Sequence, residues 1–361
     1  MKRRLPLCLM GAGLLLAWQP LLRAGDLAPA GADSTASPAP AEDFSAPPAS
    51  PVTLSYDLDA DASYVGDART NFGRAGQGDV SEAQSSARLV LGMQKGGDSP
   101  IFRLGLSYER YDFGLSKGAP VPNILQAANL VVGVDFQAFN SWLVRLEADP
   151  GFYNDARSTA FRNFNVPFSL GGSYIASENL QWIVGLGGDF NRQIPVIPAI
   201  GVRWAVTDDL VIDAVLPTPR IEYSWSKALT LYVGCDLDDG TYRLDRHFGN
   251  GVGATVVKKE VTTQKIIGYR IVPPFSPQPI YQVTRQQVST TVPGPDLNNA
   301  VVEYDEVRIG AGLTWKASKA FTFEMEAGYL PYREFDFHRA DVHFSNDDGA
   351  AYGRMSVNAQ F

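Results

Sequence analysis

The stretch SKALTLYVG, Ser226 to Gly234, decides the fold because its pattern occurs four times in the chain. The other copies are SENLQWIVG from Ser177, TDDLVIDAV from Thr207 and SKAFTFEME from Ser318. Each copy has Ser or Thr first, a charged residue second, Leu or Phe fourth and a large apolar residue sixth. Alternate residues of a strand share one face. We therefore interpret each copy as a tight turn that leads into a β-strand.

Alternation of apolar and polar residues continues over much of the chain. The longest run covers residues 306–315, where Val307, Ile309, Leu313 and Trp315 alternate with polar residues or glycine. Strands of soluble proteins average about 5 or 6 residues, whereas a tilted membrane-spanning strand needs about 9 to 11. Helical spacing of apolar residues is not sustained anywhere. The pattern favours membrane-spanning strands.

The connections between the predicted strands fall into two classes. Six are short: the four copies of the motif, Lys95 to Pro100, and Phe139 to Ser141. The opposite connections are longer, such as Gly114 to Leu125, Pro150 to Ala160, Asp238 to Ala300 and Phe335 to Gly349. Short turns on one side and long loops on the other are typical of an outer-membrane barrel.

Tryptophan supports the same interpretation. Every tryptophan after Trp18 lies within about three residues of a short turn and on the apolar face. Indole rings collect at membrane interfaces, where one side is apolar and the other wet; the alternative is chance clustering in a chain with many turns. We predict interface positions for Trp142, Trp182, Trp204, Trp225 and Trp315. The chain also ends on an aromatic residue, Phe361, which we interpret as an assembly signal.

The N-terminal part of the chain differs from the rest. Lys2, Arg3 and Arg4 precede an apolar run, which predicts a cleaved secretory signal over residues 1–24. An uncleaved anchor is the alternative, and cleavage after Ala30 is a second possibility. Residues 25–51 hold six Pro and eight Ala, a composition typical of a disordered spacer.

Charge excludes one class of partner. The signal removes four of 31 basic residues and none of 39 acidic ones, which leaves 27 against 39 and a net charge of −12. Nucleic-acid binding needs Lys and Arg and is disfavoured. We expect contacts with outer-membrane lipids, lipopolysaccharide and the barrel-assembly machinery. Oligomeric state cannot be derived from the sequence.

Two stretches resemble a known family. AIGVRWAVTDDLVIDAVLPTPRIEY from Ala199 and LTLYVGCDLDDGTYRL from Leu229 resemble an uncharacterised family of bacterial outer-membrane β-barrel proteins. The resemblance covers roughly the last half of the chain. It implies a fold and a location in the outer membrane of a Gram-negative-type bacterium, but no activity. The predicted signal implies export by the general secretion route. Residues 250–296 resemble an insertion in that family, and we predict a long outer loop or hairpin there.

We therefore predict an all-β fold, a transmembrane antiparallel β-barrel of about 14 strands over residues 52–361. Twelve strands is the alternative, if the first strand or the connection at Pro217 to Pro219 is misread. Strand starts are expected near Val52, Glu82, Ile101, Ala127, Trp142, Phe161, Leu180, Val196, Leu210, Arg220, Leu229, Val301, Phe321 and Ala351.

Charged residues share the face opposite the apolar one. On the lipid face, Lys or Arg would cost about 2 to 4 kcal/mol each at mid-depth, so these residues should face the lumen. They form either structural salt bridges or the lining of a water-filled pore. The predicted lumen charges are Asp135, Arg145, Glu147, Asp149, Arg203, Asp213, Arg220, Glu222, Arg308, Glu324 and Glu326.

One pair of lumen charges gives a specific expectation. Counting back from the turn at residues 317–320 makes Arg308 a diagonal neighbour of Glu326, within reach of its side chain. The change Arg308→Ile should then cost less folding free energy than Ile309→Arg, which places a charge in lipid.

Residues with catalytic potential are few. His247, His338 and His343 are expected in loops, where a solvated role is commoner than metal binding. Asp341 and His343 share a face and could touch a metal, but we predict no cofactor. We expect a porin-like channel or transport protein for small solutes and no enzyme. The alternatives are a non-conducting structural or adhesion barrel that displays its loops and, with less support, an outer-membrane hydrolase.

Overall fold

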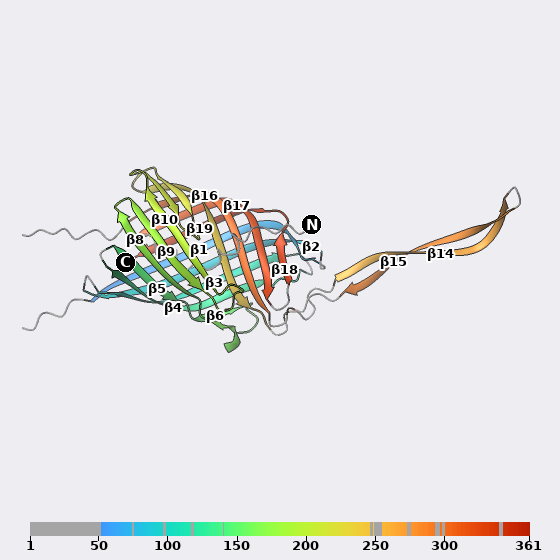
Figure 1. Ribbon diagram of the computed structural model, residues 1–361, viewed down its shortest axis with the longest axis horizontal. Helices are drawn as coiled ribbons and strands as arrows, with labels where there is room; N and C mark the ends of the chain where they lie inside the picture. The colour runs from blue at the N-terminus through green and yellow to red at the C-terminus, as the bar shows by residue number, and fades with distance from the viewer. Residues whose placement is uncertain are drawn as a thin grey trace, which may run out of the picture.

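A computed structural model describes residues 52–361, except for 74–75, 97–98, 117–118, 140, 246–247, 249–254, 273–275, 293–296, 298–299 and 339–341 (Figure 1). For residues 255–272 and 276–292 it describes the backbone. The predicted signal (1–24), the predicted spacer (25–51), His247 and Asp341 lie outside the described residues.

Seventeen strands form one sheet. Their bounds are β1 Val52–Asn71, β2 Gln77–Lys95, β3 Ile101–Leu115, β4 Ile124–Ala138, β5 Trp142–Ala148, β6 Gly151–Asn154, β7 Phe164–Asn165, β8 Phe168–Ser177, β9 Leu180–Gly188, β10 Val196–Ala205, β11 Leu210–Ala214, β12 Arg220–Ser224, β13 Leu229–Arg243, β16 Val301–Lys316, β17 Phe321–His338, β18 Val342–Asn346 and β19 Ala350–Gln360. A 3-10 turn, η4, covers Phe161–Asn163.

The sheet closes into an antiparallel barrel, because β1 pairs with β2 on one side and with β18 and β19 on the other. Three pairs of short strands (β5 with β6, β7 with β8, β18 with β19) are halves of single strands that share neighbours. Pro150 and Pro167 lie at two of these breaks, since proline cannot donate to a ladder. Counting each pair once gives fourteen strands. The fourteen-strand prediction is confirmed, and the twelve-strand alternative is wrong.

Ten of the predicted strand starts match the observed ones, and four differ. The second and fourth strands begin earlier, at Gln77 and Ile124, and the sixth begins later, at Phe164. The last begins at Val342, inside the predicted loop from Phe335 to Gly349. These differences lie at the loop end of the barrel, meaning the end opposite the six short turns. Strands there extend past the part with an apolar outer face, so the alternation used for prediction fades.

The repeated motif closes turns through its hydroxyl. The backbone N–H of Leu229 donates to Ser226 Oγ at 3.1 Å, and that of Phe321 donates to Ser318 Oγ at 3.0 Å. Thr207 accepts the same bond from Leu210 at 3.1 Å. A hydroxyl that bonds a backbone group two or three residues ahead favours a turn over a continued strand. This explains why the motif recurs at one end of the barrel.

The outer face of the barrel is apolar. On β3, Phe102, Leu104 and Leu106 are 49–61% exposed and alternate with inward-facing residues. On β16, Ile309 is 50% exposed while its neighbour Arg308 is buried. An exposed apolar band of this extent is unfavourable in water and suits a lipid environment.

Two further strands stand apart from the barrel. β14 (Thr255–Val272) and β15 (Ser276–Val292) pair as a separate antiparallel sheet with a bulge between Ile266 and Gly268. Figure 1 shows this hairpin extending away from the loop end. Within the described part of the chain, the helical content offers nothing of the length and hydropathy needed to cross a bilayer.

Candidate functional site

The lower lumen, meaning the inner face near the short turns, is lined by ion pairs. Each predicted arginine there contacts a predicted carboxylate. The pairs are Arg145–Asp135 at 2.5 Å, Arg203–Asp213 at 3.0 Å, Arg220–Glu222 at 2.7 Å and Arg220–Glu324 at 3.3 Å. Glu147 pairs with Arg88 at 2.7 Å. The charges of both signs therefore neutralise one another along the wall.

Several lower-lumen charges were not predicted. Arg354 on β19 contacts Asp61 at 2.5 Å and Asp236 at 2.7 Å. Asn358 donates to Asp57 at 3.0 Å. The signal was present, because these residues alternate with apolar ones on β1 and β19 just as Arg145 does on β5.

A buried charge cluster lies further toward the loop end, and consists of Glu82, Glu306, Arg308 and Arg333. Arg308 contacts Glu82 at 2.8 Å and Glu306 at 2.7 Å. Arg333 contacts Glu82 at 3.0 Å and also binds Glu306. All four side chains are at most 1% exposed. The two cations and two anions alternate, and Arg308 also contacts the buried Asp238 at 3.5 Å, so each charge has a partner of opposite sign, as buried charges require.

The predicted neighbourhood of Arg308 and Glu326 is wrong. In the β16–β17 register Glu326 lies opposite Gly312, four residues along β16 from Arg308, and Arg308 contacts Glu82 and Glu306. Glu326 instead accepts hydrogen bonds from Tyr232 at 2.9 Å and from Tyr352. The ladder also has a bulge on the β17 side, between Tyr329 and Tyr332, which re-aims the β17 side chains that follow it. The hydrophobic pattern contains no sign of this bulge.

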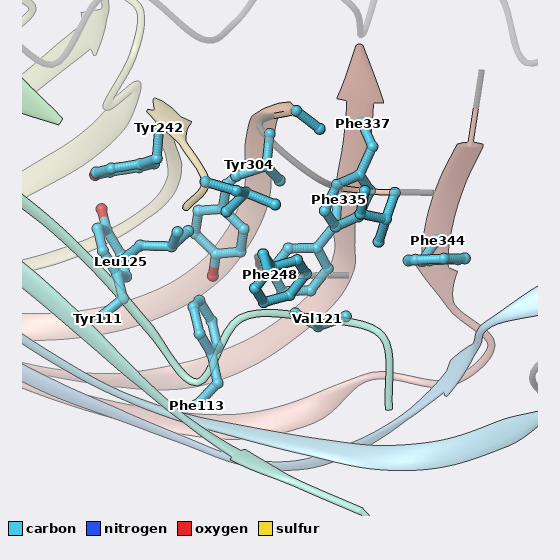
Figure 2. Close-up of a cluster of buried hydrophobic side chains, with 14 of the residues drawn as sticks. Tyr111, Phe113, Val121, Leu125, Tyr242, Phe248, Tyr304, Phe335, Phe337 and Phe344 are labelled. Carbon is cyan, nitrogen blue, oxygen red and sulfur yellow. The ribbon is translucent and has the colours of Figure 1, made fainter. Parts of the chain in front are cut away.

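An aromatic plug of buried side chains lies in the lumen (Figure 2) and adjoins the charge cluster, since the Tyr304 hydroxyl donates to Glu82. Ring centroids lie 5.3 Å apart for Tyr111–Tyr304 and for Phe113–Phe335, and 5.1 Å apart for Tyr304–Phe335. Such edge-to-face and tilted contacts are favourable beyond simple burial. The plug consists of Phe72, Val80, Tyr111, Phe113, Val121, Leu125, Ala127, Tyr153, Tyr242, Leu244, Phe248, Leu297, Ala300, Val302, Tyr304, Phe335, Phe337 and Phe344, each at most 9% exposed.

The plug closes the loop end in a narrowed barrel. The wall from β8 to β12 is short, and β13 extends beyond it as far as Arg243, where it pairs in parallel with Asn154 of β6. Fewer strands therefore surround the loop end than the turn end. This narrowing lets side chains from opposite walls meet across the lumen.

Arg192 fastens the loop after β9 over the short part of the wall. Its guanidinium contacts Glu303 at 2.5 Å and Asp305 at 2.9 Å, and also binds Asp239. Burial opposes the charge of this loop residue, but Asp305 and Glu303 outweigh burial and raise the pKa of Arg192. Arg192 had no counterpart in the sequence prediction, because its partners come from strands far along the chain.

A cavity of about 230 Å³ lies beside the plug. Its lining includes Glu109 and Asp149 from the lumen, Tyr153 and Tyr242 from the plug, and Asp189 from the loop after β9. It therefore reaches from the lumen toward the short part of the wall. Of the predicted lumen charges, Asp149 is the one that faces this cavity.

The predicted interface aromatics lie on the outer face near the short turns. Trp182, Trp204, Trp225 and Trp315 are 46–71% exposed, and Trp142 packs against Tyr174. Phe361 exchanges two backbone hydrogen bonds with Tyr56 and packs against Phe321. The interface role and the assembly role remain proposals.

The two described histidines lie in strands, not in loops as predicted. His338 ends β17 and contacts Glu303 at 2.8 Å, and His343 lies in β18 opposite Asp336. The strands β17 and β18 extend beyond the alternating region, which is why these positions resembled a loop. Over the described residues, no group of three or more His, Cys, Asp or Glu side chains is arranged to hold a metal ion.

Comparison with protein-family models and with curated protein sequences gives no match. Solved structures do match. An outer membrane channel from Pseudomonas putida F1 aligns with a TM-score of 0.39 and 9% identity, over 90% of this chain and 100% of that one. The Pseudomonas putida toluene transporter TodX aligns with a TM-score of 0.34 and 10% identity, over 87% and 90%.

The matches also include an LpxR protein from Salmonella typhimurium, with a TM-score of 0.34 and 8% identity over 84% of this chain and 99% of that one. At this level of likeness, the solute or activity of these proteins does not transfer to this chain. The uncharacterised family suggested by the stretches from Ala199 and Leu229 is supported by no family model and stays a proposal.

Proposed function

We propose that the chain is a channel for small solutes in a bacterial outer membrane, closed at rest by the aromatic plug. The observation that carries the proposal is the division of the lumen into two parts. Near the turns, Arg203, Arg220 and Glu324 keep 23–26% of their side chains exposed, so water and ions can reach them. Toward the loop end, the side chains of the charge cluster and the plug are buried, so water does not reach them. The lower lumen is thus a charged vestibule, and the charge cluster and plug form a constriction that excludes water. This arrangement is typical of a gated pore.

The outer-membrane location is part of this proposal. The apolar outer face, the tryptophans near the turns and the long loops opposite them support it. Membership of the uncharacterised barrel family would give the same location, and the general secretion route follows from the predicted signal. We infer no enzymatic role, since the His338 imidazole is already paired with Glu303 at 2.8 Å.

Planar-bilayer recording of the refolded mature protein tests the channel. We expect discrete current steps whose ion selectivity shifts toward cations in Arg203→Gln, because that change removes a positive charge from the vestibule. Lys319→Gln, in the exposed turn after β16, is the matched control and should leave selectivity unchanged. Identical selectivity in all three proteins would contradict passage through this lumen.

A second candidate is a non-conducting barrel that displays its loops for structure or adhesion. The completeness of the aromatic plug favours it, as does the projecting β14–β15 hairpin. The bilayer recording separates the two candidates. If the folded and inserted protein carries no current, as wild type or as a variant, the result would support a barrel that displays its loops.

A further inference from the structure

Three carboxylates face the cavity without forming a salt bridge to a described Arg or Lys side chain: Glu109, Asp149 and Asp189. Glu109 accepts hydrogen bonds from Tyr111 at 2.9 Å, Gln84 at 3.1 Å and Tyr242 at 3.3 Å, all neutral donors. Asp189 accepts from Asn165 at 2.9 Å and from the Asn191 backbone at 2.8 Å. Across the described side chains, no Arg or Lys nitrogen lies within 4.0 Å of Glu109, Asp149 or Asp189.

The two arginines at this cavity have their own carboxylates. Arg88 pairs with Glu147 at 2.7 Å, and Arg192 is held by Glu303 and Asp305. The cavity therefore carries an excess of negative charge in a partly desolvated setting. Such a site favours an added positive charge, since Coulomb attraction strengthens as water is excluded.

Four side-chain atoms in the same lining are buried and have no hydrogen-bond partner: the oxygens Asp149 Oδ1, Thr241 Oγ1 and Asn129 Oδ1, and one donor, Arg88 Nε. Thr241 is 3% exposed. Buried polar atoms are normally paired, so an unpaired set calls for a ligand or solvent that supplies donors. A primary ammonium carries three N–H donors and no acceptor, which matches a set of unpaired atoms in which three oxygens outnumber one donor.

Aromatic rings complete the lining. Tyr153 and Tyr242 have ring centroids 6.2 Å apart, and Phe168 lies at the side toward the short wall. Ring faces attract cations and also cover the apolar part of a small molecule. The volume of about 230 Å³ is below that of a drug-sized pocket, so the occupant is compact.

We propose that this cavity binds a small organic primary ammonium, with Asp149 as its counter-ion and Thr241 as a further acceptor. The inference deepens the proposed function by naming a solute class for the lumen. Binding rests on the cavity itself, so it can be tested apart from conduction.

Isothermal titration of the folded protein in detergent, with three probes of similar size, tests the inference. Benzylammonium, benzyl alcohol and benzoate differ chiefly in charge. We expect saturable binding of benzylammonium, at least tenfold weaker binding of benzyl alcohol, and none of benzoate. Equal affinity for benzylammonium and benzyl alcohol would overturn the inference, because the cavity would then bind an apolar additive only.

Two variants locate the site. Asp149→Asn keeps the side-chain shape and should weaken benzylammonium binding at least tenfold, while Thr241→Val should weaken it severalfold. Asp57→Asn removes the same charge from β1 near the turn end and should leave affinity within twofold. Heat-modifiable gel mobility verifies that each variant is folded. Unchanged affinity in Asp149→Asn would overturn the inference.

The two experiments, benzylammonium binding and planar-bilayer conductance, can give negative results independently of each other. A protein that binds benzylammonium but never conducts would keep this inference and remove the channel. A protein that conducts without binding benzylammonium would keep the channel and remove this inference.

Discussion

At the scale of single residues, the first hydroxyl of the repeated motif determines the turn. Ser226 Oγ accepts from the backbone N–H groups of Ala228 and Leu229 at 3.3 and 3.1 Å. Ser226→Ala should therefore lower the free energy of unfolding by about 0.5 to 1.5 kcal/mol, the usual net value of a hydrogen bond. Ser226→Thr should be nearly neutral, since Thr207 has the same role at another turn. Urea titrations in lipid vesicles measure both, and an equal loss in the two variants would contradict the assignment.

The faces of β16 can also be tested residue by residue. Ile309→Arg places a charge on the lipid face and should cost about 2 to 4 kcal/mol if Ile309 is at mid-depth. The sequence predicted a smaller loss for Arg308→Ile. The buried charge cluster reverses that expectation, because removing Arg308 leaves Glu82 and Glu306 sharing Arg333.

Breaking a buried ion pair from one side typically costs about 3 to 5 kcal/mol. We therefore expect Arg308→Ile to destabilise the barrel at least as much as Ile309→Arg in refolding titrations. If Arg308→Ile left the free energy of unfolding nearly unchanged, the charge cluster would be accessible to water and would not stabilise the barrel.

At the scale of elements, the sequence predicted strands well where one face meets lipid and the other meets the lumen. The alternation on β3 and β5 fixed both starts, at Ile101 and Trp142. The prediction of strands failed where the two faces no longer differ in this way. Phe113 and Phe335 are apolar yet face inward. Near the loop ends of β3 and β17, an apolar residue therefore no longer indicates the face that meets lipid. The bulge of β17 between Tyr329 and Tyr332 reversed the facing of later β17 residues, so that Arg333 and Phe335 are buried, without any signal in the sequence.

The loop after β9 gives a prediction at this scale. Arg192→Met should release the loop, because Asp239, Glu303 and Asp305 would lose their shared cation. Amide hydrogen exchange over residues 189–195 should rise at least tenfold, while exchange in β3 should stay unchanged. Lys316→Met, at an exposed position near the turns, is the control. Equal protection in wild type and Arg192→Met would show that Arg192 does not hold the loop.

At the scale of the whole molecule, the sequence predicted the closed barrel but could not decide whether its lumen is open. Inward-facing charges such as Arg145 fit a wet pore and a salt-bridged wall equally well. The answer depends on contacts across the lumen, such as Tyr111 with Tyr304, which join residues far apart in the chain. The resulting molecule has a charged vestibule, a buried charge cluster and an aromatic plug in series.

The most direct test of this account is the single-channel conductance of wild type beside the double variant Phe113→Ala, Phe335→Ala. These rings contact each other and Tyr304 in the plug, so their removal should open space without touching the charge cluster. The account predicts rare, small openings in wild type and a conductance at least severalfold larger in the double variant. A large, steady conductance in wild type that the double variant leaves unchanged would contradict it.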